Sequence, residues 1–153
     1  MTRTPTPMPP MENVHRDLRA WARGSHPSEA AVELLIRSAL GYRGDVIAGT
    51  CEWVDDWAFP DTDRTARYLR VGASALSGGQ QRLLAVFAAL LGAAPVNLAD
   101  VLPGLDRQHV ALVLAAVSHA AGAHQHSDVR YGPDGEVVGF GKGYLPPLFE
   151  WPA

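Results

Sequence analysis

Ser77-Gly-Gly-Gln-Gln-Arg-Leu-Leu-Ala-Val-Phe-Ala-Ala-Leu-Leu-Gly92 is the stretch around which the rest of the chain is organised. The serine and the glutamine three residues later form a capping box, in which each side chain satisfies a free backbone amide at the start of a helix. The residues from Leu83 to Leu91 are apolar nearly all round, as in a buried helix. The stretch therefore predicts a core helix at about 80–91, with Gly92 as its stop.

A second core helix is predicted at about 107–121. Asp106 is its N-cap and Gly122 its stop. Val110, Val113, Leu114 and Val117 recur at helical spacing and are expected to face inward. These two apolar helices are expected to pack together as the centre of a mainly α, compact bundle.

Shorter elements precede the core helices. Helical spacing predicts helices at about 11–23 and 27–40, and a further helix that Asp61 or Thr62 caps. Residues 45–54 fit either a helix or a strand, and residues 55–62 are expected to form an acidic aromatic loop.

The pattern changes after residue 122. Gly132-Pro133-Asp134-Gly135 fits a type I turn between two short strands, which predicts a β-hairpin followed by an extended tail. The expected organisation is a disordered Pro-rich tail at 1–10, a helical domain at 11–122, and a hairpin with a Pro/aromatic tail at 123–153.

Composition narrows the function classes. The chain has 153 residues, a net charge of −3 and a single cysteine, Cys51. This balance gives no overall attraction to nucleic acid or to an anionic membrane. A lone cysteine forms no intramolecular disulfide, and no targeting segment is visible, so we expect a soluble, cytoplasmic protein. The longest apolar run, about 14 residues, is shorter than the roughly 20 that span a bilayer.

Leu76-Ser77-Gly78-Gly79-Gln80 resembles the signature motif of ABC-type ATPases, and Leu105-Asp106 follows at about the distance of that family's next motif. The resemblance implies contact with a nucleotide held mainly by a partner subunit. The chain contains no G-x-x-x-x-G-K-[ST] loop and no Asp-Glu after a Walker B strand. We therefore interpret the motif as a helix start, whose serine, two glycines and glutamine leave amides free for an anion.

Thr65 to Leu76 is similar to the start of a helix-turn-helix of the excisionase or MerR kind. That resemblance implies a DNA-binding regulator with Gln81 and Arg82 as base readers. Phosphate contacts would then come from one of two arginine triplets at helical spacing, either Arg16, Arg19 and Arg23 or Arg64, Arg67 and Arg70.

The longest resemblance covers most of residues 27–122. The succession of Pro27 to Ile36, Arg82 to Leu90, Val96 to Asp106 and Ala115 to Gly122 resembles small actinobacterial and phage- or plasmid-borne helical proteins. It implies a protein of a mobile element and brings no activity with it.

Candidate metal ligands are densest in an H-x4-H-x-H-x-D arrangement near the second core helix. Histidines close to a helix C-terminus are also favoured by its dipole, and the chain has no H-E-x-x-H motif and no cysteine partner for them. We therefore predict no metal, no cofactor and no catalytic residue, and keep as metal candidates His119, His124, His126 and Asp128.

Two aromatic stretches are the candidate interaction residues. One is interleaved with acids and comprises Trp53, Trp57 and Phe59. The other lies in the C-terminal tail, which either docks in a partner as a linear segment or folds back over the core, and comprises Pro146, Pro147, Phe149 and Trp151.

These features favour a non-enzymatic accessory or regulatory protein that acts through contacts with another protein. A DNA-binding transcriptional regulator with a degenerate helix-turn-helix is the alternative. A degenerate or accessory partner of an ATPase is the second alternative.

Overall fold

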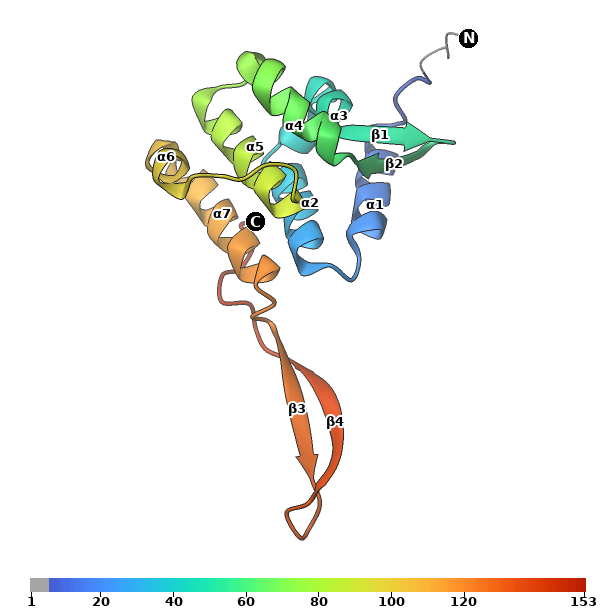
Figure 1. Cartoon of the computed structure of the whole chain (residues 1–153), viewed down its shortest axis with the longest axis vertical. Helices are drawn as coiled ribbons and strands as arrows, with labels where there is room; N and C mark the ends of the chain where they lie inside the picture. Colours follow the sequence, from blue (N-terminus) through green and yellow to red (C-terminus); the bar gives the residue numbers. More distant parts are fainter. Residues whose placement is uncertain (1–5) are drawn as a thin grey trace.

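The computed structural model describes residues 6–153, apart from the side chains of His126, Ser127 and Lys142. The fold is mainly α with a C-terminal β-hairpin, as predicted (Figure 1). Short 3-10 turns follow α2, α4 and α6. The helices are α1 (Met11–Ala22), α2 (His26–Arg37), α3 (Gly44–Thr50), α4 (Thr62–Val71), α5 (Gly78–Leu91), α6 (Leu98–Val101) and α7 (Arg107–Ala120), and the strands are β1 (Cys51–Val54), β2 (Trp57–Pro60), β3 (Gln125–Tyr131) and β4 (Val137–Tyr144).

The predicted caps of the two core helices are confirmed. Ser77 Oγ accepts from the Gln80 amide at 3.3 Å, and Gln80 Oε1 accepts from the Ser77 amide at 3.0 Å. Asp106 caps α7 by accepting from the His109 amide at 2.8 Å. Gly92 ends α5 with a φ of 81°, a conformation that glycine adopts without steric cost.

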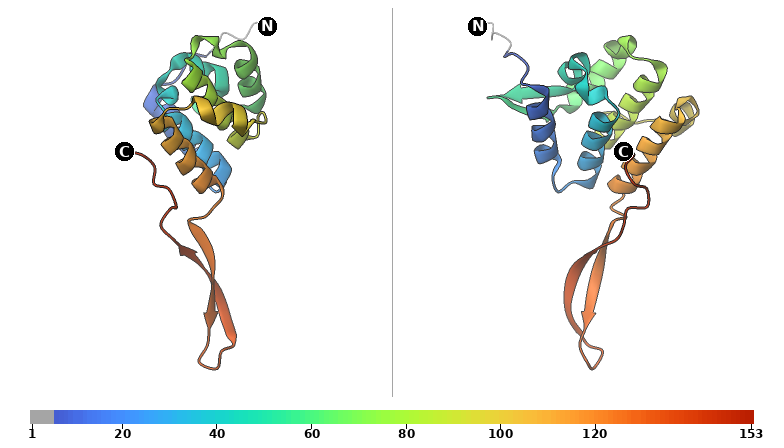
Figure 2. Two further views of the ribbon diagram at one scale, coloured as in Figure 1. Left: turned by 90° about the vertical axis from the view of Figure 1, so that its left-hand side faces the viewer. Right: turned by 180° about the vertical axis from the view of Figure 1, so that it is seen from behind.

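The centre of the body is α2, which packs against both α5 and α7 (Figure 2). The prediction that α5 and α7 form the centre together is corrected accordingly, since α2 makes the more extensive contacts with each. The reason lies in the α2 sequence. Ala30, Ala31, Leu34 and Leu35 are all buried, and the two alanines allow close approach of the neighbouring helices.

The inward face of α7 also differs from the predicted one. Leu112, Val113 and Ala116 are buried, whereas Leu114 and Val117 are 41% and 51% exposed. Only one arc of this apolar helix fits against α2, and that arc follows the 112, 113, 116 spacing of a single face.

Residues 45–60 contain both a helix and strands, where a loop was expected at 55–62. α3 is followed by an antiparallel hairpin in which Trp53 pairs with Ala58. Asp55 and Asp56 have φ values of 50° and 64°, which a two-residue hairpin turn of type I′ requires. The buried Asp17 carboxylate of α1 accepts from the Ala58 amide at 3.2 Å and so fixes this hairpin to the body.

The C-terminal hairpin projects from the body on the side where α7 ends (Figures 1 and 2). The predicted turn is confirmed, since the Gly135 amide donates to the Gly132 carbonyl at 3.0 Å. Its strands are longer than predicted, because pairing extends back to Gln125 and Tyr144. A register shift lies between Arg130 and Tyr131.

Both ends of the described chain lie on the body. The Trp53 indole Nε1 donates to the Thr6 carbonyl at 3.0 Å, and Pro9 is buried. Residues 6–10 of the predicted disordered tail therefore contact the fold, and residues 1–5 lie outside the described residues. Among the helices that the structure describes, none has both the length and the apolar composition that a membrane-spanning segment needs.

Candidate functional site

The projecting hairpin, residues 125–144, is here called the arm. Its large apolar side chains face solvent: Phe140 is 79% exposed, Tyr144 72% and Tyr131 67%. Val129 pairs with Phe140, and side chains two residues apart on a strand share a face. Val129, Tyr131, Phe140 and Tyr144 therefore lie on one side of the arm, here called the aromatic face.

The opposite side of β4 carries no side chains, because glycines occupy alternate positions in Gly139-Phe-Gly-Lys-Gly143. A Cβ atom at Gly139 would meet open space. Glycine inside a strand weakens the strand and is common where another backbone approaches closely. The arm thus presents an aromatic face and, behind it, backbone that is open at Gly139 and covered by the Arg130 guanidinium at Gly141.

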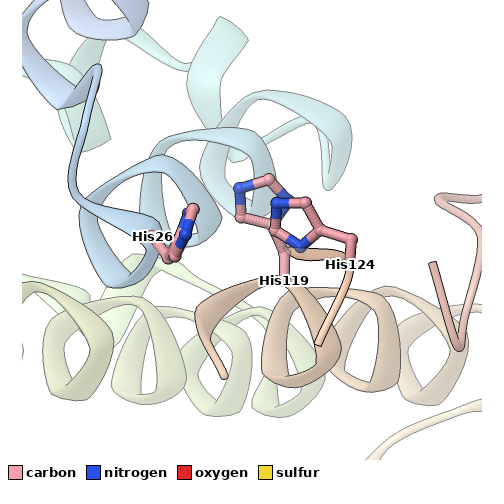
Figure 3. A group of neighbouring side chains, drawn as sticks. All are labelled: His26, His119 and His124. Carbon is pink, nitrogen blue, oxygen red and sulfur yellow. The ribbon is translucent and has the colours of Figure 1, made fainter. Parts of the chain in front are cut away.

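A cluster of three histidines lies at the base of the arm. We call His26, His119 and His124 the histidine junction (Figure 3). His26 is the first residue of α2, His119 is in the last turn of α7, and His124 lies in the turn before β3. The rings of His119 and His124 stack with centroids 4.5 Å apart, and His26 meets His124 edge-on at 4.9 Å.

Glu29 links two of these rings from one turn further along α2. Its Oε2 atom lies 2.8 Å from His119 Nε2 and 3.4 Å from His26 Nδ1, while its Oε1 accepts from the Gly24 amide at 3.0 Å. Partial burial raises the pKa of Glu29, but hydrogen bonds from His119, Gly24 and His26 outweigh burial and lower it to about 2. The carboxylate is therefore ionised at neutral pH.

The pKa of His124 lies below its ordinary value. Burial lowers the pKa of the imidazole, and positive charge on the neighbouring His119 and His26 would lower it further. A neutral imidazole is the form that coordinates metal ions.

The C-terminal tail folds back onto the body near α7 (Figure 2). The Trp151 ring lies 6.5 Å from the His119 ring. The Arg37 guanidinium lies over the Trp151 ring, 5.3 Å from its centroid. Of the two readings of the tail, the structure shows the one that folds back. Pro146, Pro147 and Phe149 stay exposed along the return path.

The structure brings together two of the four predicted metal candidates. His119 and His124 meet, whereas Asp128 lies on β3 within the arm and is not part of the group. The His126 side chain lies outside the described residues. Sequence reasoning missed His26, because it lies 93 positions before His119 and nothing local signals their contact.

The other predicted interaction residues lie on the β1–β2 hairpin. Trp53 is partly buried and packs against the core, and Phe59 is also partly buried, whereas Trp57 is 44% exposed. Alternation across the hairpin places Trp53 on the inner face and Trp57 with Phe59 on the outer one. These aromatics are therefore divided between two faces.

Four of the side chains proposed for DNA contact have partners within the chain, whereas Arg23, Arg67 and Arg70 are exposed. Gln81 Nε2 donates to the Leu76 carbonyl at 3.0 Å. Arg16, Arg19 and Arg64 form ion pairs with Asp17, Glu33 and Glu52, respectively. The face of α5 that carries Leu83, Leu84 and Phe87 is fully buried. The Ser77 and Gln80 side chains serve the capping box, next to Gly78 and Gly79.

No protein-family model, no curated protein and no solved structure matches the chain.

Proposed function

We propose that the protein is a non-enzymatic accessory or regulatory protein that binds another protein through its arm. The observation that carries this proposal is the aromatic face of the arm, which projects into solvent away from the body. Contiguous exposed apolar surface marks interaction sites, and aromatic side chains are enriched in protein interfaces.

The construction of the arm supports a role in binding. An isolated two-stranded hairpin is marginally stable in water at best, and three glycines in β4 weaken it further. A partner that covers the aromatic face would therefore stabilise the arm as it binds. The open space beside Gly139 also admits close approach from the other side, whereas the Arg130 guanidinium lies over Gly141.

Charge favours a protein partner over DNA. Among the described side chains of the arm, Asp128, Asp134 and Glu136 are acidic, and Arg130 is basic. A surface of this balance does not neutralise phosphates, which DNA binding requires. The arm instead fits a protein groove that is apolar along its floor and basic near the hairpin tip. The ion pairs of Arg16, Arg19 and Arg64 further weaken the DNA-binding alternative.

The test is site-specific crosslinking followed by measured affinity. A photoreactive benzophenone amino acid replaces Phe140 in the native host, and the crosslinked protein is identified and purified. We expect Phe140→Ser combined with Tyr144→Ser to weaken its binding at least about tenfold, as for hot-spot aromatics. Val71→Ser is the matched control, because Val71 is 75% exposed on the body.

Two outcomes would overturn the proposal. One is an affinity that is the same for the double variant and for Val71→Ser. The other is crosslinking only to a second copy of the chain, together with a dimer in light scattering, which would make the arm a self-association element.

A further inference from the structure

We propose that the histidine junction is a binding site for one divalent transition-metal ion of the zinc type, with His26, His119 and His124 as its protein ligands. This inference stands on the three histidines alone and does not depend on what the arm binds. One ligand atom from each residue can be chosen so that all three lie within 4.8 Å of one another.

The spacing is close to what a bound ion needs. Zinc–nitrogen bonds are about 2.0–2.1 Å long, so the nitrogens of a tetrahedral site lie roughly 3.4 Å apart. Binding would require these partly exposed side chains to rotate so that the stacked His119 and His124 rings turn their nitrogens toward one point. His26 and His119 have side-chain exposures of 29% and 25%, which leaves the site open to an ion from solution.

Glu29 prepares two of the rings for coordination. A carboxylate only accepts hydrogen bonds, so its contacts place protons on His119 Nε2 and His26 Nδ1. The second nitrogen of each neutral ring then keeps its lone pair. A carboxylate that orients a histidine through the ring nitrogen opposite the metal is the usual arrangement around zinc. Glu29 is thus a positioning residue.

The ligand set indicates the class of ion. Three imidazoles suit zinc, copper, nickel and cobalt, whereas calcium and magnesium prefer oxygen ligands. Three protein ligands leave one tetrahedral position for water or another group. The ligands come from α2, from α7 and from the turn before β3, so a bound ion would tie the base of the arm to the body.

The experiment is a zinc titration of the untagged chain by calorimetry at neutral pH, with native mass spectrometry for stoichiometry. We expect one zinc ion per chain. We expect His26→Asn, His119→Gln and His124→Asn each to weaken binding at least about tenfold. His109→Gln is the matched control, because His109 is a partly buried histidine at the opposite end of α7 and should leave the affinity unchanged.

Circular dichroism separates ligand loss from misfolding. If His119→Gln does not fold, His124→Asn still tests the proposal, because His124 lies in a turn outside the core. The proposal is overturned by the absence of a zinc-bound mass at upper-micromolar zinc. It is equally overturned by affinities that stay unchanged in the folded histidine variants. Neither result bears on partner binding by the arm.

Discussion

The Nε2 atom of His119 lies 2.8 Å from the Oε2 atom of Glu29, a residue 90 positions earlier in the chain. This contact joins the last turn of α7 to the first turn of α2. Because α7 leads directly into the arm, the contact also holds the point from which the arm departs. The same carboxylate reaches His26 and the Gly24 amide, so one side chain secures both sides of the histidine junction.

Glu29→Ala should therefore have two separable effects. In the metal-free protein we expect a loss of about 1–3 kcal/mol in the free energy of unfolding, because a charged acceptor is removed from partly buried donors. We also expect zinc affinity to fall about 10–100-fold, as when an orienting carboxylate is lost. Urea denaturation and calorimetry measure the two effects.

Glu29→Gln and Glu12→Ala are the companions for this test. Glutamine keeps the shape of the side chain and one acceptor, so Glu29→Gln should lower stability and zinc affinity less than Glu29→Ala does. Glu12 of α1 is exposed, so Glu12→Ala should change neither quantity. An unchanged zinc affinity in folded Glu29→Ala would contradict the positioning role.

The ion pairs of the Glu33 carboxylate should stabilise the fold at neutral pH and lose this effect in acid. It accepts from Arg19 Nε at 2.6 Å and from Arg37 Nε at 2.8 Å. Burial raises the pKa of Glu33, but these two hydrogen bonds outweigh burial and hold the pKa below its usual range. A group whose pKa is lower in the folded state contributes stability above its unfolded pKa and loses it as pH falls through the folded value.

We therefore expect Glu33→Gln to be destabilised relative to wild type at pH 7, and the difference to shrink as pH falls below about 4.5. Urea denaturation of both proteins across this range measures the difference. A gap that stays constant with pH would mean that the carboxylate charge is not the source of the stabilisation.

Much of the fold was predictable where a few neighbouring residues decide the structure. The Ser77–Gln80 capping box, the Asp106 cap and the Gly132–Gly135 turn each satisfy their hydrogen bonds within four or five residues, so local chemistry determines them. The burial of α5 from Leu83 onward was also predictable, because residues 83–91 are apolar nearly all round.

The remaining features depend on which segments meet. The inward arc of α7 is set by its contact with α2, and His26 joins His119 only because α2 and α7 pack side by side. The β1–β2 hairpin was missed for a different reason: its turn places Asp55 and Asp56 at positive φ without the glycine that usually marks such turns. Tertiary contact compensates for that unfavourable local conformation.

Replacing Asp17 should destabilise the fold through one identifiable contact. It is fully buried, its Oδ2 accepts from the Ala58 amide, and its Oδ1 accepts from Arg16 Nε and Nη2. Asp17→Ala would leave the buried Ala58 amide without its acceptor. We expect a loss of about 1–3 kcal/mol in the free energy of unfolding, measured by chemical denaturation. The exposed Asp100→Ala is the control, and an equal effect of both substitutions would contradict this role for Asp17.

The Cys51 thiol should be unreactive toward thiol reagents in the folded protein. The thiol is buried, and burial raises its pKa to about 11, so little thiolate exists at neutral pH. Because the thiolate is the nucleophile, we expect a disulfide reagent such as Ellman's reagent to react negligibly with the native chain and with one thiol per chain in guanidinium. Rapid stoichiometric reaction without denaturant would show that this part of the body opens readily.

Gly49 and Gly72 both border the ring of Tyr68, and a Cβ atom at either position would clash with that ring. Alanine at 49 would gain about 1 kcal/mol of helix propensity within α3, but overpacking costs about 1–3 kcal/mol, so the clash is expected to dominate. Gly49→Ala should therefore lower the free energy of unfolding, whereas Gly139→Ala, where the added Cβ meets open space, should have little effect.

Tyr68→Leu provides the decisive background for this substitution. If the clash with the Tyr68 ring causes the loss of stability, Gly49→Ala should be much less destabilising once leucine has replaced that ring. The double-mutant cycle should then give a coupling energy of about 1 kcal/mol or more. Thermal and urea denaturation of the four proteins measure it. Additive effects would place the strain in the α3 backbone instead, since only a direct contact makes the cost of the new methyl group depend on the side chain at 68.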